Sequence, residues 1–433
     1  MDWIAGALTF LIAAAVQPAS DQDTPPEIPV HIHVLSFPDL PIAPLGPILP
    51  TTAISADGDI VMVSLSSPGT MMTSGPSSEP AGTWVHDVAK GETHELHLVR
   101  DGKPWRLAGR SGLSADGRYV ASACTPDAGP MPKWTPGMTM SPPVATTTIA
   151  LIDRASGTNR FIDLREHGCA APLSLPDSVS LSGDGSRLAI STTPDFGHHV
   201  DHGWAMLWSS ADDSLRPLAL DDAYYGLTGP ELSADGHWLI GESFSKNEPR
   251  AGGLLRLDCA KGTSELVSLG PDDRRLIPYL RDHSLSADGQ RVAFVSKDGD
   301  AQSATRTDVF VRDLGSGTTQ RVSLARDGSD ADGSSRSCVI SGDGCYVAFV
   351  SDALNLVAQL DDAPPDLFVR ELASGRTVRV GVEDFAPDAR MVYLPALSHN
   401  GRRVVFCVDI ATQPTRVVLA DIDWAVNEGA PQR

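Results

Sequence analysis

One short motif recurs seven times along this chain of 433 residues and limits the folds that it can adopt. Each copy has Ser, a spacer and Asp-Gly or Asn-Gly before an apolar run, as in SLSADGQRVAFVS at residues 284–296. Successive copies are 59, 68, 51, 53, 55 and 57 residues apart, a spacing typical of repeat architectures such as propellers. The turn residues are Asp57, Asp116, Asp184, Asp235, Asp288, Asp343 and Asn400.

Each copy of the motif has the character of a β-hairpin. Asp-Gly and Asn-Gly can adopt the positive φ values that a tight primed turn requires, and the Ser two positions earlier can bond local backbone. The run that follows is apolar on both faces, because no polar residue alternates in Val-Ala-Phe-Val at residues 292–295. A strand of this kind must be covered on both sides, and stacked blades of a propeller provide that cover.

A second hairpin motif follows each of the first six copies, as in DVFVRDLGSGTTQRVSL at residues 308–324. Two hairpins per repeat make a four-stranded blade of about 50 residues. We therefore predict an all-β, seven-bladed β-propeller over residues 29–425. The seventh copy has no clear fourth strand, whereas residues 29–37 (PVHIHVLSF) form a spare strand. We predict that this N-terminal strand pairs into the last blade and closes the ring, which removes exposed sheet edges.

Residues 284–382 resemble the TolB-like (WD-like) β-propeller repeat of bacterial exported proteins. The similarity lies in S-x-D-G-x-x-V-A-F-x-S followed by D-V-F-V-R-D-L-x-S-G-x-T-x-R-V-S, and it extends in weaker form over residues 50–425. TolB itself has an α/β domain ahead of its propeller, but only residues 20–52 separate the N-terminal apolar segment from the first repeat here. The resemblance thus implies a TolB-like propeller without the TolB N-terminal domain. It implies the fold and leaves the function open.

The N-terminus predicts export. The apolar run at residues 3–16 is too short to span a bilayer with ease, and small residues at Ala15 or Ala19 suit cleavage of a signal peptide. Asp2 and the lack of Lys or Arg before the run depart from that pattern, and a mis-set start codon or a buried N-terminal strand are the alternatives. We expect a signal peptide at residues 1–19, a linker at 20–28 and a C-terminal tail at 426–433. No lipobox cysteine and no membrane span are evident, so we expect a periplasmic or extracellular protein.

The net charge of −21 narrows the class of partner. Such a field repels phosphate backbones and anionic membrane surfaces, which excludes nucleic acid and favours cationic ligands, metal ions or a basic protein patch. The same charge also fits simple solubility. None of the six cysteines shows the C-x-x-C spacing of a zinc site, and Cys124 with Cys169 is the best candidate for a disulfide. We expect a monomer.

Chain order assigns the loops to two faces of the ring. The tight turns fall on one face, and the long segments that join hairpins and blades fall on the other, where function concentrates in a rigid scaffold. The long segment at residues 124–146 carries Trp134 and Met138 among several prolines, and it either grips a partner or packs over its own blade. The long segments are 66–81, 124–146, 193–202, 270–282, 325–337 and 352–365.

Three groups of polar residues are candidate sites. The starts of the innermost strands bring a ring of mixed charge to the channel mouth, which either binds a polar ligand or pairs internally. Its members are Arg110, Asp177, Glu231, Asp282 and Arg336. A candidate calcium-binding loop contains Asp327, Asp330 and Asp332. The spacing from Asp327 to Asp330 is one residue longer than in an EF-hand loop, and no Glu follows at the last ligand position. The histidines at residues 198–202 suit either a transition metal or a solvated loop. We expect no cofactor, and calcium is the alternative.

Catalytic motifs are absent from the sequence. It contains no G-x-S-x-G, no P-loop and no dinucleotide fingerprint. We therefore expect an exported scaffold that binds a protein partner or a small polar ligand through its long-loop face. The alternative is a propeller enzyme, a hydrolase or lyase acting on a small polar or sugar substrate at the channel mouth, where scattered side chains could assemble a site.

Overall fold

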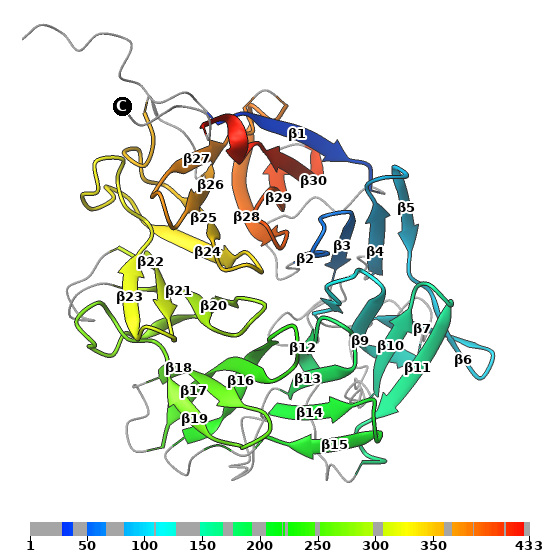
Figure 1. The fold of residues 1–433 in the computed structure, drawn as a ribbon. Coiled ribbons are helices and arrows are strands. Elements are labelled where there is room, and N and C mark those ends of the chain that lie inside the picture. The colour runs from blue at the N-terminus through cyan, green and yellow to red at the C-terminus, as the bar shows by residue number, and fades with distance from the viewer. Residues whose placement is uncertain are drawn as a thin grey trace, which may run out of the picture.

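Seven antiparallel sheets surround a common axis in this protein (Figure 1). The computed structural model describes residues 28–37, 50–65, 82–107, 110–126, 148–167, 176–192, 205–218, 220, 224–246, 252–297, 306–358, 366–383, 385–410 and 413–427. Within these ranges the only helical element is a short 3-10 turn at Trp424–Asn427. The prediction of an all-β, seven-bladed propeller is confirmed. The signal peptide predicted at residues 1–19 and most of the predicted tail lie outside the described residues.

Each blade has four antiparallel strands, and they are ordered from the innermost strand, nearest the axis, to the outermost strand. The first four blades contain β2 (Pro50–Ile54), β3 (Ile60–Leu65), β4 (Gly82–Asp87) and β5 (Glu92–Glu95); β8 (Gly112–Leu113), β9 (Tyr119–Pro126), β10 (Thr148–Asp153) and β11 (Thr158–Asp163); β12 (Pro176–Leu181), β13 (Arg187–Thr192), β14 (Ala205–Ser209) and β15 (Ser214–Pro217); and β16 (Tyr224–Leu232), β17 (Trp238–Ser245), β18 (Gly252–Asp258) and β19 (Ser264–Leu266).

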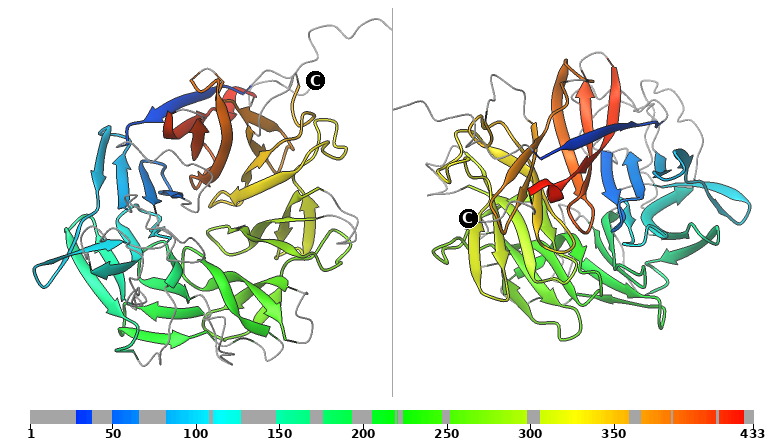
Figure 2. Two further views of the ribbon diagram at one scale, coloured as in Figure 1. Left: turned by 180° about the vertical axis from the view of Figure 1, so that it is seen from behind. Right: turned by 45° about the horizontal axis from the view of Figure 1, so that its top comes forward.

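The last three blades continue the same order. They contain β20 (Pro278–Leu285), β21 (Arg291–Ser296), β22 (Asp308–Asp313) and β23 (Thr318–Arg321); β24 (Ser335–Ile340), β25 (Tyr346–Ser351), β26 (Asp366–Glu371) and β27 (Thr377–Val380); and β28 (Ala389–Leu397), β29 (Arg403–Ile410) and β30 (Gln413–Ile422) with β1 (Val30–Leu35). Strand β1 pairs antiparallel with β30, from Val30 opposite Ile422 to Leu35 opposite Val417. The first and last strands of the described chain therefore lie side by side in blade 7 (Figure 2).

The apolar run after each turn is buried on both faces of its blade. In β21, Val292, Ala293, Phe294 and Val295 are all fully buried. Val292 and Phe294 pack into the core between blades 4 and 5, while Ala293 and Val295 pack into the core between blades 5 and 6. The buried apolar residues form seven such clusters, one for each pair of neighbouring blades. Side chains that alternate along one strand thus belong to two different cores.

The Ser-x-Asp-Gly turns are held by their own side chains. In the fifth blade, Ser286 donates to Asp288 at 2.6 Å, and its Oγ accepts from the backbone N–H of Arg291 at 2.9 Å. The prediction of a primed turn with positive φ at both Asp and Gly is wrong. Only the glycines have positive φ, as at Gly289 with φ of 70°, because the Ser and Asp side chains hold the preceding residues in a turn that a left-handed glycine then completes.

Backbone hydrogen bonds link each turn to the turn of the next blade and run around the whole ring. The seven bonds are 2.7 to 3.0 Å long, and the bond from His399 to Ala56 joins blade 7 to blade 1. Six of the seven spacer residues at these turns, those of blades 1 to 6, are alanine or glycine. Gly183 illustrates the reason, since a Cβ there would lie 3.0 Å from the carbonyl oxygen of Ala234. The bonds run from Ala56 to Ala115, Ala115 to Gly183, Gly183 to Ala234, Ala234 to Ala287, Ala287 to Gly342, Asp343 to His399 and His399 to Ala56.

A second set of contacts around the ring involves the turn glycines. The side chain two positions after each glycine lies against the glycine of the next blade, so that an added Cβ would overlap it. Trp238 covers Gly289 in this way, and Arg403 of blade 7 covers Gly58 of blade 1. The ring is therefore continuous through its turns as well as through β1.

One hairpin was not predicted. Strands β6 (Leu98–Arg100) and β7 (Lys103–Leu107) lie in the connection from blade 1 to blade 2, and β7 pairs with the end of β9, from Trp105 opposite Pro126 to Leu107 opposite Cys124. The guanidinium of Arg100 lies 5.3 Å from the ring of Trp105 and 5.1 Å from that of Phe161. These cation–π contacts fasten the hairpin onto blade 2.

The turn contacts predict different costs for two substitutions at glycines with the same φ of 70°. Gly317→Ala meets no atom within 4 Å and should cost about 1 kcal/mol of unfolding free energy, from backbone strain alone. Gly289→Ala would place its Cβ 2.5 Å from Trp238 and should cost about 1–3 kcal/mol more. Urea unfolding of the two variants checks this, and equal midpoints would contradict the proposed role of the contact between blades.

Candidate functional site

The two ends of the ring differ in how much their connections vary. At one end, five residues join the first two strands of every blade, such as residues 55–59 in blade 1, and we call this the turn end. At the opposite end, the connection between the second and third strands ranges from two residues at 411–412 to 21 residues at 127–147. We call this the variable end. It is the long-loop face predicted from the sequence.

Several predicted residues lie outside the described part of the chain. Trp134 and Met138 fall within residues 127–147, and the histidines at 198–202 fall within residues 193–204. Asp177 lies in β12, but its side chain is not described. Their proposed roles in binding therefore remain predictions.

The predicted ring of mixed charge comes from neighbouring inner strands. Arg110 forms a parallel bridge with Ser178 of the next blade, just before the short strand β8. Arg336 lies in β24 opposite Val350, next to a register shift that ends at Val339. Both residues are partly buried at the side of the blade nearest the axis.

Glu231 and Asp282 join blades to one another. Glu231 of β16 accepts a hydrogen bond from the backbone N–H of Leu285 in blade 5 at 3.1 Å. Asp282 of β20 accepts from the backbone N–H groups of Ser337 and Cys338 in blade 6, both at 2.9 Å. Ser337 has a positive φ of 53° within the irregular part of β24, which turns two successive N–H groups toward one carboxylate. Both carboxylates therefore join their own blade to the backbone of the next one.

Two residues that sequence reasoning missed complete this group. His283 and Glu242 are buried with side chains 4% and 3% exposed, and Nδ1 of His283 lies 3.3 Å from Oε1 of Glu242. Nε2 of His283 donates to the carbonyl of Gly229 at 2.9 Å. We call Glu231, Glu242, Asp282 and His283 the inner-strand cluster. The signal that could have found it was the run Arg-Asp-His before Ser284, which places polar residues in a strand expected to be buried.

Burial and charge shift the pKa values within the inner-strand cluster. Burial raises the pKa of Glu231 and of Asp282 above their ordinary values, against the lowering effect of the hydrogen bonds and of His283. Burial alone would lower the pKa of His283, but Glu242 and Glu231 together raise it. Glu231, Asp282 and His283 therefore bind protons more readily than the same groups in water. Perturbed groups of this kind occur both in structural networks and in functional sites.

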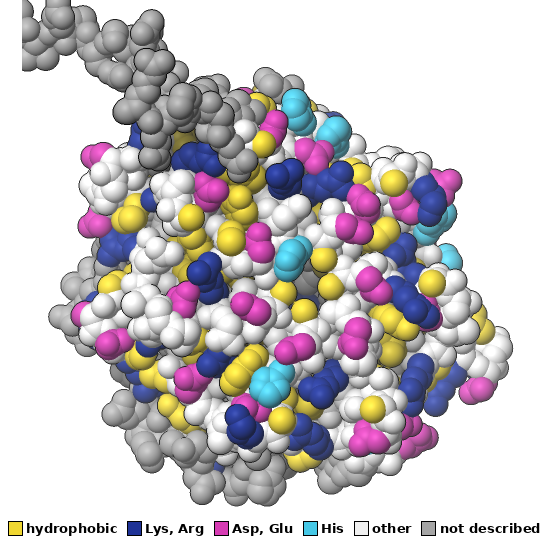
Figure 3. Space-filling view, viewed as in Figure 1, with side chains coloured by type: hydrophobic (Ala, Val, Ile, Leu, Met, Phe, Trp, Pro, Cys, Tyr) yellow, Lys and Arg dark blue, Asp and Glu magenta, His cyan; other side chains and the backbone are white. Residues whose placement is uncertain are grey.

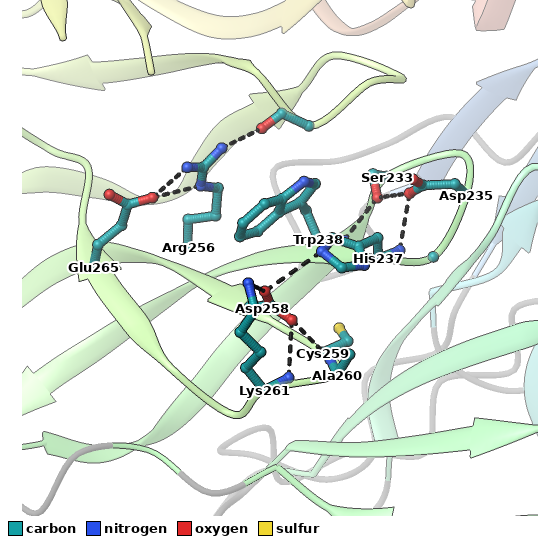
Figure 4. A network of polar contacts seen from close by, with 12 residues as sticks. Ser233, Asp235, His237, Trp238, Arg256, Asp258, Cys259, Ala260, Lys261 and Glu265 are labelled. Atoms are coloured by element: carbon teal, nitrogen blue, oxygen red, sulfur yellow. Dashed lines mark hydrogen bonds and ion pairs between the residues drawn. The ribbon is translucent and has the colours of Figure 1, made fainter. Parts of the chain in front are cut away.

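Blade 4 shows how polar side chains support the turn end (Figure 4). The guanidinium of Arg256 lies 4.0 Å from the ring of Trp238 and donates to the carbonyl of Gly289 in blade 5 at 2.9 Å. Asp258 accepts from the backbone N–H groups of Ala260 and Lys261, both at 2.9 Å. These polar groups stabilise turns and contacts between blades.

The three aspartates of the predicted calcium loop have separate partners. Asp327 accepts from Ser329, and Asp330 pairs with Arg321 at 2.6 Å. Asp332 accepts from the backbone N–H of Leu354 at 2.7 Å. No group of three or more His, Cys, Asp or Glu side chains in the described ranges is arranged to hold a metal ion.

Cys124, the candidate partner of Cys169, is a buried free thiol, and Cys169 lies outside the described residues. Burial raises the pKa of Cys124 to about 12, so the thiol stays protonated and unreactive. In the described ranges, no helix has the length and apolar character needed to cross a membrane.

Comparisons with known proteins show the fold. No family model matches the chain, and no curated protein matches it. Among solved structures, it is similar to oligogalacturonate lyase from Vibrio parahaemolyticus, with 12% identity over 91% of this chain and 97% of that one and a TM-score of 0.51. It is also similar to TolB from Acinetobacter baumannii, with 15% identity over 86% and 79% of the two chains and a TM-score of 0.38. A putative TolB from Agrobacterium tumefaciens has 12% identity over 78% and 96%, with a TM-score of 0.40.

The inner-strand cluster predicts how stability depends on pH. Because the pKa of His283 is raised in the folded state, its stabilising contribution is fully present below the ordinary value of 6.5 and is lost as the pH rises through the folded value. The raised pKa values of Glu231 and Asp282 also make the unfolding free energy fall as the pH rises. His283→Gln should therefore reduce the loss of unfolding free energy between pH 6 and pH 8, measured in urea. His94→Gln, an exposed imidazole, is the control, and an unchanged slope in His283→Gln would contradict the assignment.

The aspartates at 327, 330 and 332 predict a response to chelation. Because each has its own partner within the protein, EDTA should leave the melting temperature unchanged, and added calcium should not raise it. Calorimetry with and without about 1 mM EDTA, a concentration that removes calcium from sites of sensor-class affinity, measures both effects. A fall of several degrees that calcium reverses would restore the calcium hypothesis.

Proposed function

We propose that this propeller is a binding protein that acts outside the cytoplasm and recognises its partner through the variable end of the ring. The observation that carries the proposal is the contrast between the two ends. At the turn end, the connections between the first and second strands have one length and are bonded to one another. At the variable end, the connections between the second and third strands differ by up to 19 residues, from two at 411–412 to 21 at 127–147. Rigid scaffolds that bind partners commonly present variable connections in this way.

The backbone contacts of the two partly buried acids favour binding over the alternative of a propeller enzyme. Glu231 and Asp282 accept backbone hydrogen bonds from the next blade, so moving either carboxylate toward a substrate would leave buried N–H groups unpaired. The prediction of catalysis at the channel mouth included these two residues together with Arg110, Asp177 and Arg336. The contacts of Glu231 and Asp282 give them a sufficient structural role.

Charge supports a partner with basic groups. The net charge is −21, and acidic and basic side chains are interspersed over the face seen in Figure 3 rather than gathered into one patch of a single sign. An excess of acid of this size attracts basic proteins and small cationic ligands over long range and repels nucleic acid. The apolar run at residues 3–16 supports export, which places the search for partners in the cell envelope or the medium.

The proposal predicts that the insertion at residues 127–147 contributes to capture of a partner. Replacing it with Ala-Thr, the two-residue connection of blade 7, should lower recovery of a cross-linked envelope partner by at least about tenfold while the urea midpoint stays unchanged. Trp134→Ala and Met138→Ala should lower it in smaller steps. Quantitative mass spectrometry of tagged protein measures recovery.

The matched control is Lys90→Ala, an exposed side chain at the turn end. It should leave recovery of the partner unchanged. A partner that is retained by the insertion variants and lost in Lys90→Ala would place recognition at the turn end and overturn the proposal.

A further inference from the structure

Strand β1 forms the outer edge of blade 7 and contains no Asp, Glu, Lys, Arg or Pro. Its inner side pairs with β30, and no described strand pairs with its outer side (Figure 2). The outermost strands of the other six blades each contain at least one Asp, Glu or Arg, and they are β5, β11, β15, β19, β23 and β27. Charges and prolines commonly keep a sheet edge from pairing with another chain, so β1 is the one outermost strand among the described blades that lacks this protection.

One hydrogen bond shows which backbone groups of β1 face outward. The N–H of Asp423 donates to the carbonyl of Pro29 at 3.0 Å, so the carbonyl of Pro29 points toward β30. Alternate residues of an antiparallel strand bond to opposite sides. The backbone N–H and C=O groups of Val30, Ile32 and Val34 therefore point away from β30, toward the outside of the blade.

The free edge is rigid and ends at Ser36. The Ser36 carbonyl is next in the outward series, and it accepts a hydrogen bond from the side chain of Thr93 in blade 1. Val34 is 45% exposed, whereas Val30 and Ile32 pack against the core between blades 6 and 7. Because these inner contacts already hold β1 in an extended shape, pairing its outer side with another strand would cost little ordering entropy.

The sequence of β1 is complementary to itself. Residues 30–34 read Val-His-Ile-His-Val, which is the same in both directions. If two copies of β1 meet antiparallel about a two-fold axis at Ile32, Val30 of each copy lies opposite Val34 of the other. The outward-facing residues then oppose one another, and each opposed pair can exchange two hydrogen bonds. Across the same boundary, His31 of one copy lies opposite His33 of the other.

We propose that the outer edge of β1 binds β1 of a second copy of this chain, antiparallel and centred on Ile32. The palindrome favours a second copy over an unrelated strand, because it makes the two sides of the contact identical. A contact limited to two strands of six residues buries less than the roughly 1,200 Å² typical of stable complexes, so the dimer should be weak, with a Kd of about 10–100 µM. This inference goes beyond the proposed function, does not depend on it, and differs from the monomer expected from the sequence.

Sedimentation equilibrium of the full chain over about 1–200 µM measures the dimer. Val34→Lys places a charge on the exposed part of the edge, and Val34→Pro removes an outward N–H, so each should raise the Kd at least about tenfold. Val99→Lys is the matched control, because Val99 is 58% exposed on β6, and it should dimerise like the parent protein. Urea midpoints show whether each variant is folded. A monomer throughout this range, or an equal loss of dimer in Val99→Lys, would overturn the proposal.

Disulfide cross-linking tests the register of the two strands. His31 and His33 of the other copy would oppose each other at a non-hydrogen-bonded position, where Cβ atoms lie about 4.5 Å apart, close to their separation in a disulfide. His31→Cys and His33→Cys are made separately with Cys345→Ser, which removes an exposed thiol. Mixed and oxidised, the two variants should form a disulfide-linked dimer, whereas each variant alone should form little. A dimer that gives no cross-link in the mixture, as expected if β1 were exchanged between rings, or that cross-links equally well within one variant, would refute the proposed pairing.

Discussion

The middle strands of each blade carry apolar side chains on both faces. The closed ring buries both faces, because every blade has a neighbour on each side. Phe294 and Val295 are neighbours in β21, yet they belong to the cores on opposite sides of blade 5. Removing one blade would expose a face of each of its two neighbours, at roughly 25 cal/mol for every Å² of apolar surface. A single blade is therefore not a stable unit, and stability depends on a closed circle of seven interfaces.

The same requirement determines what polar groups do inside the ring. Inner strands are the edges of their sheets, and several are irregular, so they carry backbone N–H groups that need acceptors. Glu231 and Asp282 supply those acceptors across the boundary to the next blade. Both carboxylates lie on the inner strands, and each holds a contact between neighbouring blades. His283 is buried against Glu242 for a related reason, since an acid in a low-dielectric wall is stabilised by a protonated neighbour.

The sequence predicts this fold well because its signals are local and repeated. Ser286, Asp288 and Gly289 make their turn with bonds that span five residues at most, and the apolar run beside them needs no distant information to be recognised. The β6–β7 hairpin was missed because it depends on Arg100 stacking on Phe161, which lies 61 positions further along the chain. The partners of Glu231 and Asp282 were missed for the same reason. Contacts between blades join residues about 55 positions apart, and spacing alone does not show which N–H groups an irregular strand leaves unpaired.

The asymmetry between the two ends of the ring follows from these contacts. At the turn end, a longer connection or a larger spacer side chain would break a chain of seven hydrogen bonds, as the 3.0 Å approach of the Ala234 carbonyl to a Cβ at Gly183 illustrates. His399 is the one bulky spacer, and it fits because Gly342 of the preceding blade has no Cβ to meet its ring. No comparable network links the described connections of all seven blades at the variable end. Length and composition can change there without loss of the fold, so recognition is expected to develop at that end, while the turn end keeps the seven blades in register.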